Sequence, residues 1–151
     1  MLSRRNLTQL LLTSIATHTS CPVGDSNTPD PPYGWDGQPG EIGSKFKPYS
    51  ILTPMSSGRA TGPLSDTHAD WQLNYSLSSV GTTREQCEWI CDKARSSFVV
   101  LKNTTFDGID GTYKIQQIRT ESIGGIVRSD SVEPNMFGQT DVFSVWVSKG
   151  L

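Results

Sequence analysis

The most regular hydrophobic pattern in the chain lies between residues 70 and 77, where apolar and polar side chains alternate without interruption. The apolar positions are Trp71, Leu73, Tyr75 and Leu77, and each is flanked by polar residues. A period of two places the two sets on opposite faces of a β-strand. Because a sheet with one apolar and one polar face is usually antiparallel, the pattern predicts an antiparallel strand with one face toward the core.

A helical pattern follows this strand after the sequence VGTT. Thr82 or Thr83 can cap the first turn, and Glu85 or Gln86, three residues later, can complete a capping box. We therefore predict a helix over residues 83–96. Its inner stripe comprises Cys87, Ile90, Cys91 and Ala94, continued by Phe98, and its outward face carries Arg84, Glu85, Glu88, Asp92 and Arg95.

A second helical pattern lies near the N-terminus, where Ser3 or Asn6 can cap the first turn. Arg4 and Arg5 before an apolar run also resemble a secretory signal, but polar residues interrupt the run and no small-residue cleavage site follows. No stretch of the sequence is long and apolar enough to predict a membrane span. We predict an amphipathic helix whose apolar face carries Leu7, Leu10, Leu11 and Ile15.

Residues 18–44 form a long segment rich in proline, glycine, aspartate and serine. Proline lacks a backbone donor and glycine is costly to order, so no regular element is expected here. Connections of this length are usually functional or disordered. Tyr33 and Trp35 lie within the segment, and we expect them to pack either on their own domain or on a neighbouring subunit.

The remaining apolar segments predict further strands, at residues 46–55, 98–101, 111–119, 124–129 and 141–148. Phe143, Val145 and Val147 share one face of the last strand, and Val142 and Trp146 lie on the other. Helices are few and do not alternate with strands. The sequence therefore predicts one α+β domain over residues 1–151, a mainly antiparallel sheet with two helices on one face and a long Pro/Gly-rich loop after the first helix.

Charge and composition disfavour two classes of partner. The net charge of −2 is spread along the chain without a block of either sign. A nucleic-acid binder usually carries a basic face or run, and neither DNA nor an anionic membrane is therefore the expected partner. The odd cysteine number predicts free thiols in a reducing compartment rather than a disulfide framework.

The sequence contains no convincing catalytic or metal-binding constellation. Cys87 and Cys91 are one helical turn apart, but further ligands at a typical spacing are missing, so packing in the helix–sheet seam is favoured. His68 has no nearby nucleophile, and it is expected in an exposed turn. The motif FDGIDG at residues 106–111 lacks the ligands of a calcium loop and predicts a hairpin turn. We expect no enzyme activity, no cofactor and no metal.

About a third of the chain resembles the tail terminator proteins of long-tailed phages that infect actinobacteria. A strand of the type PY-x-x-L-x-P leads there to a turn GPL-x-D-x-x-AD, an alternating strand ending in SVG, and a helix beginning TREQ-x-EW. The matching residues here are Pro48, Tyr49, Leu52, Pro54, Gly62, Pro63, Leu64, Asp66, Ala69, Asp70, Ser79, Val80, Gly81, Thr83, Arg84, Glu85, Gln86, Glu88 and Trp89.

The resemblance implies a non-enzymatic virion protein that uses no cofactor and assembles in the host cytoplasm. Such proteins form a ring, commonly a hexamer, which caps the tail tube, stops polymerisation of the tail tube protein and meets the head–tail connector protein. DNA passes through the ring without being read. Trp and Arg are favoured interface anchors, so the candidate contact residues are Arg84, Glu85, Glu88, Trp89, Trp35 and Tyr33.

Three other classes remain open at the level of the sequence. Another head–tail neck or completion protein would share the ring but bind on the portal side. A secreted bacterial binding domain is suggested by the N-terminal arginines, Cys21 and three N-x-S/T sequons. A small hydrolase would require Cys87 or Cys91 as a reactive thiol.

Overall fold

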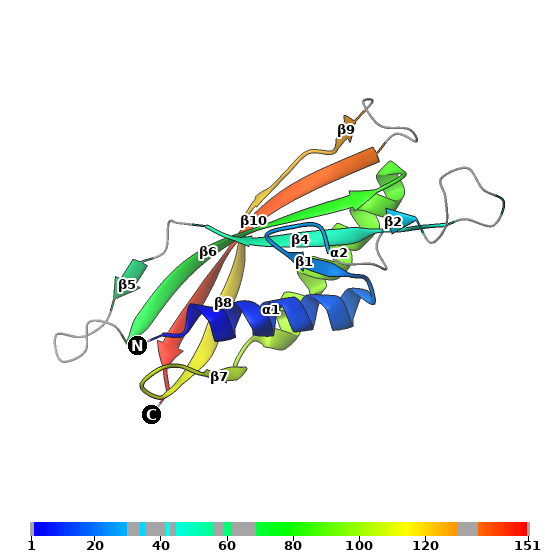
Figure 1. Cartoon of the computed structure of the whole chain (residues 1–151). Coiled ribbons are helices and arrows are strands. Elements are labelled where there is room, and N and C mark those ends of the chain that lie inside the picture. Colours follow the sequence, from blue (N-terminus) through cyan, green and yellow to red (C-terminus); the bar gives the residue numbers. More distant parts are fainter. Residues whose placement is uncertain are drawn as a thin grey trace.

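The computed structural model describes residues 2–29, 34–35, 42, 45–55, 59–61, 69–129 and 136–150. These residues form two helices and a strongly curled, mostly antiparallel sheet (Figure 1). The predicted α+β class is therefore confirmed. Within the described part of the chain, neither helix is long and apolar enough to cross a membrane.

The main sheet has the strand order β1-β4-β6-β10-β8-β7, with β5 added to β6 and β9 added to β10. All described neighbours are antiparallel except β1 and β4, which are parallel. Two short strands, β2 and β3, form a separate antiparallel pair. The strand bounds are β1 Val23–Asp25, β2 Gly34–Trp35, β3 Phe46–Lys47, β4 Tyr49–Pro54, β5 Arg59–Thr61, β6 Asp70–Gly81, β7 Thr105–Asp107, β8 Thr112–Ile123, β9 Val127–Ser129 and β10 Met136–Lys149.

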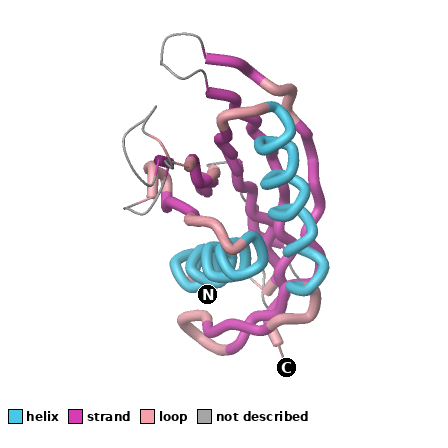
Figure 2. The backbone as a smooth tube through the Cα atoms, turned by 90° about the vertical axis from the view of Figure 1, so that its right-hand side faces the viewer, coloured by secondary structure: helices cyan, strands magenta, loops and turns pink. Residues whose placement is uncertain are grey.

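The core lies between one face of this sheet and the two helices, α1 (Arg4–Thr19) and α2 (Arg84–Leu101) (Figure 2). The predicted alternation in β6 is confirmed, because Leu73, Tyr75 and Leu77 are buried while the residues between them are partly exposed. Tyr75 lies opposite Phe143 of β10, and their rings stack with centroids 5.7 Å apart. The predicted inward face of β10 is confirmed in the same way, since its members Phe143, Val145 and Val147 are all buried.

Helix α1 is fixed to the sheet by polar contacts as well as by its buried leucines. Ser3 caps its start by accepting a hydrogen bond from the backbone N–H of Asn6. The guanidinium of Arg4 donates to the backbone carbonyls of Met55 and Asn74, and it lies over the ring of Tyr75. The Tyr75 hydroxyl in turn shares a hydrogen bond of 3.0 Å with Thr8. The arginine that resembled part of a signal sequence thus holds the helix against β4 and β6.

Three predictions from the sequence are wrong. Residues 18–44 were expected to hold no regular element, but Val23–Asp25 form β1, which pairs with β4, and Gly34–Trp35 form β2. Residues 98–101 were expected to form a strand, but they complete the last turn of α2, which begins at Arg84 and ends at Leu101. Phe98 and Leu101 point into the core at helical spacing, and this packing overrides the strand preference of the two valines between them. Residues 46–55 form two strands instead of one, because β3 and β4 separate at Pro48.

Candidate subunit interface

The joint between β6 and α2 explains half of the motif SVG-x-TREQ-x-EW. Thr83 caps α2 by accepting a hydrogen bond from the backbone N–H of Gln86. The side-chain oxygen of Gln86 accepts from the backbone N–H of Thr82, a shifted form of the predicted capping box. A side chain at Gly81 would approach the backbone nitrogen of Cys87 to 3.0 Å, so glycine suits this tight turn. These motif residues therefore build the turn from strand to helix.

The other half of the motif faces outward from the first two turns of α2. We call Arg84, Glu85, Glu88 and Trp89 the helix-start patch. Arg84 and Glu88 are one helical turn apart and form an exposed ion pair, with 2.6 Å between a guanidinium nitrogen and a carboxylate oxygen. Trp89 is 46% exposed, and it lines a shallow depression together with Glu85. Exposed ion pairs contribute little to folding and an exposed tryptophan contributes less than a buried one, so this surface is available to a partner.

The two candidate residues of the long loop are placed only in part. Tyr33 lies outside the described residues, and the backbone of Trp35 forms β2, where it pairs with Phe46 of β3. The Gln86 side-chain amide donates to the carbonyl of the same Phe46 at 3.3 Å. The helix-start patch and the β2–β3 pair are therefore linked through Gln86, although the structure describes no side-chain contact of Trp35.

The three cysteines are free thiols and all are buried. A hydrogen bond shared with Cys91, together with burial, raises the pKa of the Cys87 thiol far above its ordinary value. Burial also raises the pKa of Cys21. No three potential metal-ligating side chains cluster among the described residues. His68 lies outside those residues, whereas the FDGIDG motif joins β7 to β8 as the predicted hairpin turn. The hydrogen bond between Cys87 and Cys91 also lowers the pKa of Cys91, and both thiols are buried on the inner face of α2.

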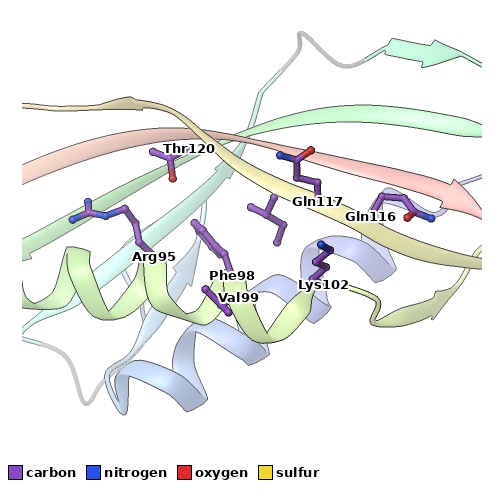
Figure 3. A pocket seen from close by; sticks show the side chains of 8 residues that line it. Arg95, Phe98, Val99, Lys102, Gln116, Gln117 and Thr120 are labelled. Atoms are coloured by element: carbon purple, nitrogen blue, oxygen red, sulfur yellow. The ribbon is translucent and has the colours of Figure 1, made fainter.

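A groove that we did not predict lies between the C-terminal half of α2 and strand β8 (Figure 3). Its volume is about 520 Å³. The helix contributes one basic and two apolar side chains, its C-cap residue contributes a second basic one, and β8 contributes mostly polar ones. Val99, on the helix side, is 78% exposed. The lining residues are Arg95, Phe98, Val99, Lys102, Gln116, Gln117, Ile118 and Thr120.

One wall of this groove is held by the buried carboxylate of Asp141 on β10. Arg95 donates to it at 2.8 Å, and Arg95 also pairs with exposed Asp92 on its own helix. The other oxygen of Asp141 accepts from the side chain of Gln139 and from the backbone N–H of Gly124. A single carboxylate thus ties α2, β10 and the end of β8 together. The sequence held no signal for this role, since Asp141 resembled any polar residue at a strand start.

The outer edge of β8, which borders the groove, is largely open. β7 covers it only over Thr112–Lys114, and Ile115 exchanges backbone hydrogen bonds with residues 103–104. Over residues 116–123, no backbone group of the described chain pairs with this edge. Unpaired strand edges of this length present donors and acceptors to other chains. Apolar alternation could not reveal the edge, because it identifies strands but not their neighbours.

Comparisons with known proteins add no family assignment. No family model matches the chain, and no curated protein matches it. One solved structure, whose name states no function, is similar over 98% of this chain and 93% of its own, at 12% identity and a TM-score of 0.49. At that level the likeness carries no functional argument.

Proposed function

We propose that this protein is a tail terminator of a long-tailed phage, a structural protein of the virion without enzyme activity. It forms a ring, most simply a hexamer, that caps the tail tube, stops polymerisation of the tube protein and joins the tail to the head connector. DNA passes through the lumen without being read.

The observation that carries the proposal is that some residues of the motif SVG-x-TREQ-x-EW build the turn from β6 to α2 while others face outward. Gly81, Thr83 and Gln86 build the joint between β6 and α2, so their presence is explained by folding alone. The residues of the helix-start patch lie on the outer surface. Their one described ion pair, between Arg84 and Glu88, is exposed and contributes little to folding. A motif that combines a structural joint with an exposed Trp/Arg surface is what a subunit interface requires.

A ring also needs two different surfaces on each subunit, because each copy meets the next in a head-to-tail contact. The helix-start patch lies beside the β2–β3 pair, which immediately precedes β4 near one end of the main sheet. The groove and the open edge of β8 lie toward the other end of the strand order. The chain thus offers two non-identical surfaces of the kind that a closed ring uses.

The test is assembly with the tail tube protein of the same phage. We expect native mass spectrometry to detect a ring of this protein, alone or on tube ends, and electron microscopy to show tubes that stop growing at a capped end. Immunogold labelling should place the protein at the head-proximal end of tails that lack heads. A protein that stays monomeric both alone and with tubes, or that leaves tube growth unchanged, would disprove the proposal.

The matched variants separate the two halves of the motif. Thr83→Ala removes the helix cap and should lower the free energy of unfolding by about 1 kcal/mol, while leaving the capping of tubes intact under folding conditions. Trp89→Ala should leave folding nearly unchanged and reduce ring formation. If both variants assemble like the natural protein, the helix-start patch is not a subunit contact.

A further inference from the structure

The groove between α2 and β8 has the features of a site for an extended segment of another chain. The open edge of β8 over residues 116–123 offers backbone donors and acceptors to an added strand. Alternate side chains of such a strand would point toward α2, where Phe98 and Val99 supply an apolar surface. Strand addition beside a groove of this kind combines backbone pairing with side-chain selection.

The charge of the groove indicates what kind of segment fits it. Its lining includes two basic side chains, Arg95 and Lys102, and no acidic one. Arg95 is already paired with Asp92 and Asp141, so Lys102 is the cation that a ligand would meet. Figure 3 shows the side chain of Lys102, the residue that follows α2, pointing toward β8. An acidic segment with apolar residues would therefore complement this surface.

Residues 26–44 of the same sequence have this composition. The segment contains Asp30, Asp36 and Glu41, and it has no lysine or arginine. It also contributes Tyr33, Trp35 and Ile42, and Ile42 is fully exposed. A fully extended chain half as long as this segment spans about 30 Å.

The position of this segment also suits a head-to-tail contact. In sequence it lies between β1 and β4, which are neighbours at one end of the strand order, and β8 lies toward the other end. Strand β2 lies within this segment and pairs with β3 as a ribbon of two strands with two residues each. Such short ribbons are marginally stable by themselves. Support from a neighbour would offset this cost.

We infer that the groove between α2 and β8 receives part of residues 26–44 of a neighbouring copy of this chain, with Lys102 meeting the acidic side chains of that segment. Its first residues stay on their own subunit, where the N–H of Ser26 donates to the carbonyl of Leu52 and Pro29 is buried. The inference rests on the proposed ring, and it names the donor and acceptor of each subunit contact. Because every copy provides one segment and one groove, the contact closes only when the ring is complete.

Photo-crosslinking tests the contact directly. Benzoylphenylalanine at position 99 places the probe at an exposed residue of the groove, and the same probe at Lys93, which is exposed on α2 outside the groove lining, is the control. The assembly, alone or on tail tubes, is formed from equal amounts of ¹⁵N-labelled and unlabelled protein. We expect crosslinked peptides that join position 99 of one copy to residues 26–44 of another, and none from position 93. Crosslinks from position 99 to the same chain or to any other segment would overturn the inference.

Charge reversal provides a second readout. Lys102→Glu should weaken self-association about tenfold, whereas Lys93→Glu should leave it unchanged. Lysine substitution of Asp30, Asp36 and Glu41 should also weaken self-association, and combining it with Lys102→Glu should restore part of the loss. Equal effects of the two single reversals would contradict the contact. If tubes are still capped but the crosslinks lie elsewhere, only this inference fails, and if no assembly forms, the proposed function fails with it.

Discussion

Strands β10 and β8 are neighbours in one sheet, but only β10 is enclosed. β10 pairs with β6 along one edge and with β8 and β9 along the other, and its inward residues are buried. β8 is buried at Tyr113 and Ile115, where β7 and residues 103–104 cover its edge, and it is mostly exposed beyond them. Ile123, at the end of β8, is largely exposed although the same side chain would suit a core. The difference lies in pairing as well as in residue type, because residues 116–122 of β8 are mostly polar and this part of its outer edge has no described strand beside it.

The largest expected effect concerns the side chain that joins these two regions. Asp141→Ala leaves Arg95 and the N–H of Gly124 without their buried acceptor, so we expect the free energy of unfolding to fall by about 3 kcal/mol. Asp92→Ala removes the exposed partner of the same arginine and should cost less than about 1 kcal/mol. Urea denaturation of the two variants checks this, and equal losses would contradict a role of Asp141 as the link between β10 and β8.

The turn from β8 to β9 gives a smaller effect with a matched neighbour. A side-chain carbon at Gly124 would lie 2.2 Å from the carbonyl oxygen of Thr140, whereas one at Gly125 meets nothing within 4 Å. Gly124→Ala should therefore lower the free energy of unfolding by about 2 kcal/mol, and Gly125→Ala by less than about 0.5 kcal/mol. Thermal unfolding distinguishes them. Similar midpoints for both variants would mean that β8 is not held as close to β10 as described.

The buried thiol of Cys87 predicts that the free energy of unfolding depends on pH. The pKa of Cys87 is raised by its hydrogen bond with Cys91 and by burial, so the folded protein retains this proton more strongly than the unfolded chain. The stability contributed by Cys87 is complete below pH 9.0, the ordinary value, and is lost progressively as pH rises above it. The same hydrogen bond lowers the pKa of Cys91, and this acts in the opposite direction. At one pH unit higher, Cys87 alone should account for a loss of roughly 1 kcal/mol, and Cys91 offsets part of it.

Unfolding measured between pH 8 and pH 10 tests this, with Cys87→Ala expected to show the weaker dependence. A thiol reagent should leave Cys87 unmodified in the folded protein and should react with it only after the protein unfolds. Rapid modification of the native protein would instead support a reactive thiol, as a hydrolase would need.

The smallest effect on folding is expected at the helix-start patch. Trp89→Ala and Arg84→Glu change exposed side chains, so each should alter the free energy of unfolding by no more than about 0.5 kcal/mol. We nevertheless expect both to lower ring formation in light scattering, since a patch with no role in folding can still anchor a neighbour. The control is Lys93→Ala, on the exposed face of the same helix. If both variants assemble normally, the helix-start patch is an ordinary solvated surface and not a subunit contact.

Much of the fold could be predicted because local patterns agree with the tertiary structure. The alternation from Trp71 to Leu77, the caps at Ser3 and Thr83, and the turn after Phe106 are each determined by neighbours in sequence. Residues 98–101 were misassigned because Val99 and Val100 favour strands, while the contacts that keep them helical come from Phe98 and Leu101 in the core.

The groove could not be predicted for a related reason. Its two walls, α2 and β8, are brought together by Asp141, a residue distant from the groove-lining part of either element in sequence. Strand pairing decides which backbone edge remains open, and a single sequence does not specify pairing. The helix-start patch could be predicted because the capping motif indicates where α2 begins. Once the start of the helix is known, its spacing shows which residues of the first turns face outward.

Strand β10 follows every other described strand in sequence, yet it lies in the middle of the sheet between β6 and β8. During synthesis, β6 and β8 therefore emerge from the ribosome before the strand that separates them, and they cannot adopt their final positions until it arrives. Contacts over such long sequence separations slow folding, and the waiting strands are open to wrong partners. A chaperone that shields β6 and β8 during this interval would raise the yield of folded protein more than one that acts later.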